Sequence, residues 1–253
     1  MLRLPLSALV CLAVVGACQP PAEASTPDAP LPATMAPGAS VDATGPVVVE
    51  LFTSEGCSSC PPADRLLAEL DERVVALAYH VDYWDRLGWA DPYGDAAYSA
   101  RQRAYAGTLD GRVCTPQMVV GGTRGVVGSG ATAARAAIEA APALRVPVRL
   151  EARLDGRAVV VGAAAPDAPD GAVLHLAIVQ RTASSDVRRG ENGGRRLDHV
   201  RVVRALETVE TPPGTARLPL PDGLDASEVC VEALVQRGRV GPIAGAAEGR
   251  VEV

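Results

Sequence analysis

Cys57 and Cys60, two cysteines three residues apart, are the residues whose type and spacing most directly indicate chemistry. They follow an apolar, β-branched stretch at 47–52 and precede a helix-forming stretch at 61–70, so they lie where a strand hands over to a helix. The free N–H groups and the dipole of a helix N-terminus stabilise a thiolate, and a thiolate is the species that attacks a disulfide. The placement therefore predicts thiol–disulfide chemistry.

Two other interpretations of this pair are a static structural disulfide and one half of a zinc site. Zinc needs a second cysteine pair or histidines at ligand spacing, but His80, His175 and His199 are scattered along the chain. We therefore predict no metal and no cofactor. The static disulfide stays open as an alternative.

The double proline after the pair restricts where the helix begins. Pro61 and Pro62 have no N–H group to donate, so they fit only in the first turn, where no intrahelical donor is needed. We expect the helix to begin at Ser59 or Cys60. Cys57 then lies slightly outside the best position of the dipole, which weakens the stabilisation of its thiolate.

The composition narrows the class of protein. Hydrophobic residues make up 48% of the 253 residues and aromatic residues only 3%, which predicts a core mostly of Val, Leu and Ala. The net charge of -6 argues against a nucleic-acid partner. All 24 basic residues are arginine, so Schiff-base chemistry on lysine is excluded.

The first residues have the pattern of an export signal. Arg3 supplies positive charge, the stretch 4–15 is apolar, and Val15-Gly16-Ala17-Cys18 resembles a bacterial lipobox, with Cys18 as the lipidated residue. An ordinary signal peptide with a chance cysteine is the alternative. We predict a signal peptide over 1–17 and a Pro- and Ala-rich tether over 18–45. The folded part is then held at a membrane of the cell envelope through its lipid anchor, facing the periplasm. The resemblance to lipoprotein sorting signals implies the outer membrane, in a cell that has one, because Gln19 rather than Asp follows the cysteine.

Residues 46–145 carry an α/β pattern. Strands are expected at 47–52, 74–81, 118–120 and 124–128, and helices at 61–70, 95–109 and 131–140. Their order, with the cysteine pair after the first strand and Thr115-Pro116 before the third, resembles the thioredoxin fold. The resemblance implies a cis bond before Pro116, which shapes a substrate groove against the cysteine pair.

Several segments resemble one bacterial exported family, known as domain of unknown function 1223. They are residues 50–64, 80–85, 115–119, 187–192 and 199–200, and the resemblance extends over roughly 46 to 237. The family implies a thioredoxin-like domain without an established substrate. With Cys57 attacking and Cys60 resolving, the substrate is a protein or small molecule that carries a thiol or disulfide. Ser58-Ser59 differs from the Gly-Pro of thioredoxins, so no redox potential carries over.

Further candidates surround the pair. Glu50 is a carboxylate in an apolar strand, and if buried it has the raised pKa that a proton relay needs, although a solvent-facing or arginine-paired Glu is equally consistent. Thr115 and Gln117 flank the proline. Asp82 and Trp84 follow the second strand, at the sheet edge where α/β folds place sites, so they line a groove or merely cover the core.

Residues 146–253 change to alternating strands and predict a small antiparallel β-sandwich domain. The expected strands are at 148–154, 158–162, 173–180, 200–206, 215–218 and 229–236. A basic loop at 188–196 binds an anion, reaches back to the first domain or is simply solvated.

Removal of the signal peptide deletes Cys11 and lipidation uses Cys18, so two cysteines remain besides the Cys57–Cys60 pair, namely Cys114 and Cys230. We expect Cys114 to lie nearer to Cys57 and Cys60 than Cys230 does, and we expect no disulfide between Cys114 and Cys230. Taken together, the sequence predicts a lipid-anchored thiol–disulfide oxidoreductase. The alternative is a binding or assembly module of the envelope that Cys57–Cys60 staples permanently.

Overall fold

The computed structural model describes residues 46–210 and 214–253. The expected signal peptide at 1–17, the tether at 18–45 and the lipidation residue Cys18 lie outside the described residues. No helix within the described ranges has the length and apolar character that crossing a membrane requires.

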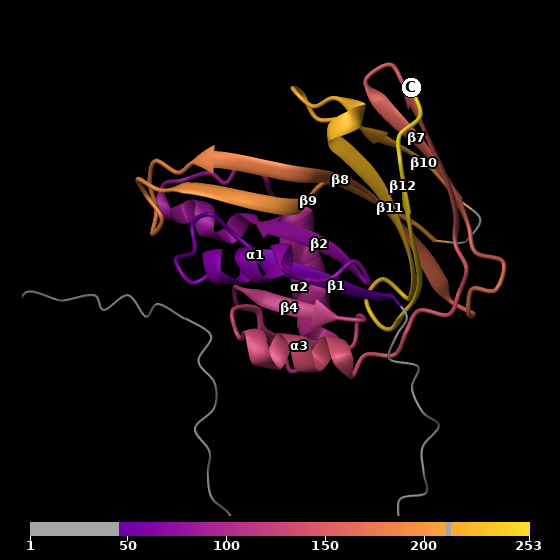
Figure 1. The fold of residues 1–253 in the computed structure, drawn as a ribbon, viewed down its shortest axis with the longest axis horizontal. Helices are drawn as coiled ribbons and strands as arrows, with labels where there is room; N and C mark the ends of the chain where they lie inside the picture. The colour runs from indigo at the N-terminus through magenta and orange to yellow at the C-terminus, as the bar shows by residue number, and fades with distance from the viewer. Residues whose placement is uncertain (1–45, 211–213) are drawn as a thin grey trace, which may run out of the picture.

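The fold is built on one large mixed sheet with few helices (Figure 1). Its N-terminal strands are β1 (Val47–Thr53), β2 (Val74–Val81), β3 (Gly94–Asp95), β4 (Gln117–Val120) and β5 (Arg124–Val127). β1 and β2 run parallel, and β4 and β5 extend the sheet antiparallel on the other side of β1. The parallel pair is joined by α1 (Pro61–Ala68), as the strand–helix–strand pattern predicts.

Helices cover both faces of these strands. They are α1, the 3-10 helix η1 (Asp82–Leu87), α2 (Ala96–Thr108) and α3 (Ala131–Glu139). Because side chains alternate along a strand, Val49 and Leu51 of β1 pack with α1 and α3, whereas Val48 and Phe52 share a core with α2. The Asp95 side chain accepts from the backbone N–H of Ala97 and caps α2, which agrees with the expected helix at 95–109.

The C-terminal half adds its strands to the same sheet. β8 (Ala172–Asp186), β9 (Arg196–Val209), β11 (Val229–Arg237) and β12 (Ile243–Gly249) continue it in the order β12-β11-β8-β9-β2-β1-β4-β5. β9 joins β2 where Val202 lies opposite Ala78. The sheet therefore crosses the boundary expected at residues 145 and 146, and the two-domain division is not confirmed. β3 and β12 have no counterpart among the expected strands.

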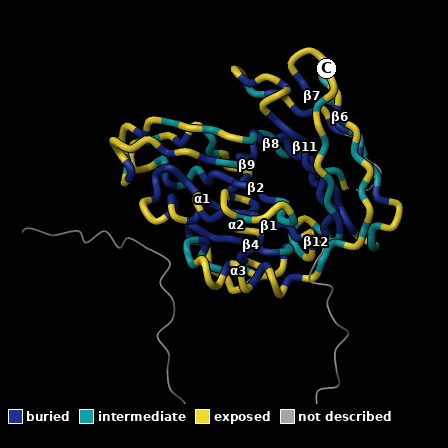
Figure 2. Tube along the Cα trace, viewed as in Figure 1, coloured by how far each residue is buried: buried dark blue, intermediate teal, exposed yellow. Residues whose placement is uncertain are grey.

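A second, three-stranded sheet completes the C-terminal half. It consists of β6 (Arg149–Asp155), β7 (Ala158–Ala164) and β10 (Gly214–Pro219), in the order β10-β7-β6. Its residues Val159, Val161 and Leu218 share a core with Leu176 of β8 and Val231 of β11. Figure 2 shows the buried strands in the interior and exposed residues at the turns. The short 3-10 helix η2 (Ala226–Glu228) precedes β11.

A buried arginine of α2 contacts strands from both halves of the chain. Arg101 on α2 donates to Glu50 of β1 over 2.7 Å, and the two side chains are 5% and 0% exposed. The same guanidinium donates to Gln236 of β11 over 2.8 Å and lies 3.3 Å from His175 of β8. Since Arg101 contacts three strands of the sheet, it fastens its two halves together.

Replacing Arg101 by Met is expected to destabilise the protein by about 3–5 kcal/mol, because the Glu50 carboxylate is left buried without its countercharge. Unfolding in urea, followed by circular dichroism, measures the free energy. Arg112→Met is the matched control: Arg112 pairs with Asp110 on the surface, where the side chains are 61% and 48% exposed, and should change stability by less than about 1 kcal/mol. Equal losses in the two variants would contradict the structural role of Arg101.

Candidate active site

The cysteine pair sits at the junction that the double proline predicts. Cys60 is the N-cap of α1, with the prolines in the first two helical positions, so the expected helix start is confirmed. Both thiols are free and buried, with Cys57 1% and Cys60 0% exposed. Gly56 precedes the pair because a Cβ there would lie 2.9 Å from Cβ of Trp84. Glycine thus lets the Trp84 ring pack against the turn.

The surroundings of the two thiols differ and shift their pKa values apart. A hydrogen bond from the Cys60 thiol is the main cause that lowers the pKa of Cys57 to about 6, and Ser59 and Thr115 assist against the opposing effect of burial. Burial raises the pKa of Cys60 well above its usual value, and the charges of Cys57 and Asp64 raise it further. At neutral pH Cys57 is therefore the more readily ionised thiol and Cys60 the protonated one.

The segment around Thr115 lies directly beside Cys57. The carbonyl oxygen of Thr115 is 3.7 Å from Cys57 Sγ and accepts from Ser59 Oγ over 3.3 Å, and the Thr115–Pro116 bond is cis as expected. Indole N–H of Trp84 donates to Thr115 Oγ1 over 2.8 Å. Of the four residues expected to line a groove, Thr115 and Trp84 are thus brought together at the pair.

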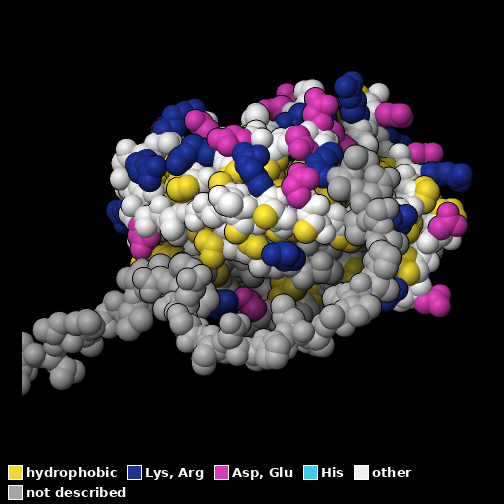
Figure 3. All heavy atoms as spheres, turned by 60° about the horizontal axis from the view of Figure 1, so that its bottom comes forward, with side chains coloured by type: hydrophobic (Ala, Val, Ile, Leu, Met, Phe, Trp, Pro, Cys, Tyr) yellow, Lys and Arg dark blue, Asp and Glu magenta, His cyan; other side chains and the backbone are white. Residues whose placement is uncertain are grey.

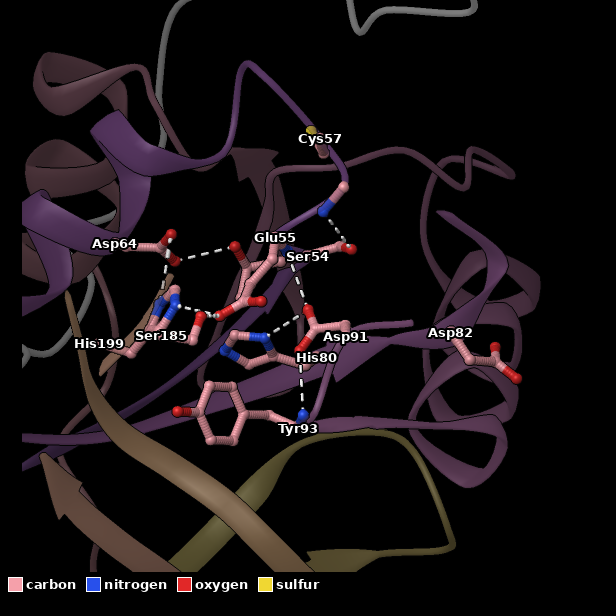
Figure 4. A network of polar contacts seen from close by, with 12 residues as sticks. Ser54, Glu55, Cys57, Asp64, His80, Asp82, Asp91, Tyr93, Ser185 and His199 are labelled. Atoms are coloured by element: carbon pink, nitrogen blue, oxygen red, sulfur yellow. Dashed lines mark hydrogen bonds and ion pairs between the residues drawn. The ribbon is translucent and has the colours of Figure 1, made fainter. Parts of the chain in front are cut away.

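The other two groove candidates are engaged elsewhere. Gln117 accepts from Gln102 of α2 over 2.9 Å, and Asp82 accepts from Ser99 of the same helix. In Figure 4, Asp82 points away from the cysteine turn. These contacts fix α2 against β4 and η1, so Gln117 and Asp82 have a structural role.

Glu50 is buried and arginine-paired, one of the two alternatives to a proton relay. Besides Arg101, its carboxylate accepts from the Tyr105 hydroxyl, and both partners lie on α2. Among the described residues, the polar contacts of Glu50 do not include either cysteine.

The C-terminal half contributes to the site through the connection between β8 and β9. Glu191 accepts from the backbone N–H and the hydroxyl of Ser58, over 2.8 and 2.7 Å. The fully buried Asn192 donates to the carbonyl oxygens of Glu55 and Cys57, both over 2.9 Å. The loop expected at 188–196 therefore does reach back to the cysteine turn. Glu191 and Asn192 were not predicted as site residues, although this loop was singled out.

Beneath the turn lies a group of buried ionisable residues, here termed the acid–histidine cluster: Glu55, Asp64, His80, Asp91 and His199. Figure 4 shows them turned toward one another from β2, α1, β9 and the loops that follow β1 and η1. Imidazole Nδ1 of His80 is 2.8 Å from the Asp91 carboxylate, and Nε2 of His199 is 3.1 Å from that of Glu55. The two imidazole rings meet edge to face with centroids 4.8 Å apart. None of these five was a sequence candidate for proton transfer.

Charge interactions in this cluster shift several pKa values. Burial raises the pKa of Asp64, although His199, His80 and Thr53 oppose it. For His80 the penalty of burial is outweighed by the Asp91 carboxylate, so its pKa is raised. The reciprocal contact overcomes burial at Asp91 and lowers its pKa.

One group of side chains in the described part of the chain has the spacing of metal ligands. Donor atoms of Cys230, Glu232 and Glu248 lie within 4.8 Å of one another. The guanidinium of Arg201 donates to all three, over 3.3 Å to Cys230 and 2.8 Å to Glu248. Because Arg201 already pairs with both carboxylates, the group suits this guanidinium better than a metal ion. Cys230 is a free thiol, so the absence of a Cys114–Cys230 disulfide is confirmed.

The fold and the site together define a mixed α/β protein with a buried, asymmetric dithiol at a strand–helix junction. The chain belongs to the family described as protein of unknown function (DUF1223), whose sequence profile matches residues 48–236. The family resemblance seen in the sequence is thereby confirmed.

Solved structures similar to this chain include two from bacteria. Protein AGR_C_4864 from Agrobacterium tumefaciens is 29% identical, with a TM-score of 0.61 over 80% of this chain and 93% of that one. HBP35 of Porphyromonas gingivalis is 16% identical, with a TM-score of 0.55 over 82% of this chain and 75% of that one, and shows similarity of fold alone. No curated protein sequence matches this chain.

Thiolate absorbance at 240 nm checks the asymmetry of the dithiol. In the reduced protein, absorbance from Cys57 should rise with pH through a midpoint near 6. In Cys60→Ala the midpoint should move upward, because the main hydrogen bond that stabilises the thiolate is lost. Cys230→Ala is the control, since burial raises the pKa of Cys230 to about 11 and it contributes no thiolate in this range. A midpoint near 8.5, the value of an ordinary thiol, would contradict the interpretation.

Proposed function

We propose that this protein is an exported, lipid-anchored, thioredoxin-like thiol–disulfide oxidoreductase. The observation that carries the proposal is the dithiol itself: Cys57 and Cys60 are free thiols with opposite pKa shifts, next to Thr115 and Pro116. A low pKa at the first thiol makes a nucleophile and a good leaving group. No cofactor is needed for this exchange.

In the reducing direction, the Cys57 thiolate attacks one sulfur of a substrate disulfide. One substrate thiolate leaves, and a mixed disulfide with Cys57 remains. Cys60 then loses its proton and attacks Sγ of Cys57, which breaks the mixed disulfide and releases the second substrate thiolate. Two electrons pass from the dithiol to the substrate, and the reverse sequence oxidises a substrate dithiol.

The substrate class is a protein or a small molecule with an accessible disulfide or dithiol. Cys57 is 1% exposed, so a partner reaches Sγ only after neighbouring side chains move, whereas Ser58 and Ser59 are exposed beside it. Thr115, Pro116 and Trp84 are the groove residues that we retain, and Gln117 and Asp82 support them through α2.

The proposed location rests on the sequence pattern of the first 45 residues. A signal peptide over 1–17 directs export. Lipidation at Cys18 and a tether over 18–45 then hold the dithiol part (46–145) and the β-rich part (146–253) at an envelope membrane. On the face shown in Figure 3, arginine side chains are interspersed with Asp and Glu. Such mixed charge is consistent with a protein or small-molecule partner rather than nucleic acid.

A second candidate function is a binding or assembly module with a permanent Cys57–Cys60 bond. It is favoured by the contacts of Glu191 and Asn192, which hold the turn in place from the other half of the chain. A structural bond and an exchangeable one differ in their reduction potential.

Purified full-length protein should reduce a model disulfide or oxidise a model dithiol, and Cys57→Ser should abolish turnover because the attacking sulfur is gone. Cys230→Ser is the matched control, because Cys230 is equally buried but its hydrogen bonds within the described residues are to Val179 of β8 and Arg201 of β9. It should retain activity. Turnover that persists in Cys57→Ser would refute the assignment.

Redox titration of the Cys57–Cys60 pair against glutathione buffers separates the two functions. An exchangeable pair has a potential above about -300 mV, whereas a permanent structural bond lies below it. We expect the higher value, because the low pKa of Cys57 stabilises the reduced form. Alkylation of the free thiols followed by mass spectrometry reads out the fraction reduced. A potential below that limit would favour the binding module.

A further inference from the structure

The exchange reaction leaves the acid–histidine cluster without a role. Its five residues are at most 7% exposed, and burying so many ionisable groups is costly unless they are paired or used. Two imidazole nitrogens, Nε2 of His80 and Nδ1 of His199, are buried and have no hydrogen-bond partner among the residues that the structure describes. Such unsatisfied groups require an explanation.

The resolving step needs a base. Cys60 is fully buried, and a thiol must lose its proton before its sulfur attacks the mixed disulfide. Solvent does not reach this thiol in the structure. The acceptor must therefore come from the protein or from a water held by it.

Asp64 has the position of that acceptor. It follows Cys60 by one turn of α1, and residues four apart on a helix are neighbours on the same face. One carboxylate oxygen accepts from Thr53 Oγ1 over 2.8 Å, while the other is 3.8 Å from Nδ1 of His199. Within the described residues, this second oxygen accepts no hydrogen bond. Both carboxylate oxygens of Glu50, by contrast, accept hydrogen bonds, one from Arg101 and one from Tyr105.

The groups around Asp64 lead from the dithiol toward the surface. His199 follows on β9, and its Nε2 is hydrogen-bonded to Glu55. Glu55 in turn accepts from Ser185 of β8 and from the indole N–H of Trp89, both of which are half-buried. Asp64 thus lies on α1 between Cys60, whose pKa its charge raises, and His199, whose hydrogen bond to Glu55 leads toward the edge of the protein.

We propose that Asp64 is the proton acceptor of Cys60. His199 and Glu55 then pass this proton toward the protein surface. This inference rests on the proposed oxidoreductase function. The Cys60 proton passes to the Asp64 carboxylate, directly or through one water, and the thiolate attacks Cys57 Sγ while the substrate thiolate leaves. Burial of Asp64 raises its pKa toward the value of an efficient acceptor.

Other charged groups that face Asp64 set the pH range of this step. His199 from β9 and His80 from β2 favour its ionised form, whereas Asp91 from the loop before β3 opposes it. The charge of Asp64 in turn raises the pKa of Cys60 at the N-cap of α1. Glu55 and Tyr93 contact His199 from the other side. The relay therefore contains groups from both halves of the chain.

The test uses full-length protein and glutathione disulfide, and it follows the two steps separately by acid quenching and mass spectrometry. Asp64→Asn should form the mixed disulfide at the wild-type rate but resolve it about 100-fold more slowly, the lower end of the effect of a general base. The defect should shrink with rising pH, because Cys60 then ionises without help. Asparagine keeps an acceptor for Thr53 and removes a buried charge, so near-UV circular dichroism should show a retained fold.

Glu50→Gln is the matched control and should resolve at the wild-type rate, since Glu50 is a buried carboxylate outside the acid–histidine cluster and contacts Arg101 and Tyr105. Wild-type resolution should already be fast below pH 8.5, the pKa of an ordinary thiol. Resolution that accelerates only above that pH, or equal rates in wild type and Asp64→Asn, would overturn the relay. If Cys60→Ser forms no mixed disulfide at all, the oxidoreductase function fails, and the relay fails with it.

Discussion

The junction of β9 with β2 is the contact on which the site depends. Val202 joins the sheet opposite Ala78, and the long β8–β9 hairpin is thereby laid along the strands that carry the cysteine turn. This placement brings His199 to Asp64 and lets Asn192 hold the carbonyl oxygen of Cys57. Without the shared sheet, the turn would lose the partners that come from the second half of the chain.

Two buried carboxylates, Glu50 on β1 and Asp64 on α1, differ in how their charges are satisfied. Around Glu50, the Arg101 guanidinium and the Tyr105 hydroxyl satisfy both carboxylate oxygens, which makes a closed structural unit. Around Asp64 the charges are only partly satisfied, and imidazole nitrogens stay unpartnered. A carboxylate whose two oxygens both accept hydrogen bonds stabilises one arrangement of its partners. A carboxylate with one oxygen left without a hydrogen bond can still take up a proton.

The asymmetry of the two thiols arises from short-range contacts more than from the helix dipole. Cys57 lies before the N-cap, where the dipole acts weakly, yet hydrogen bonds with Cys60, Ser59 and Thr115 lower its pKa. Cys60 sits at the helix end itself, but burial prevails there and keeps it protonated. The loss of solvent thus outweighs the favourable dipole at the second thiol.

Local signals in the sequence determined the cysteine turn, the start of α1 at Cys60 and the extent of α2, because proline geometry and side-chain capping act within a few residues. The position of Glu50 in an apolar strand left its burial as one possibility. The sequence did not identify Arg101, 51 residues away, as its partner. Only the tertiary structure decided that β9 extends the first sheet and that Asp64 meets His199. Pairing between distant segments depends on the packing of whole strands, and no short stretch of sequence encodes it.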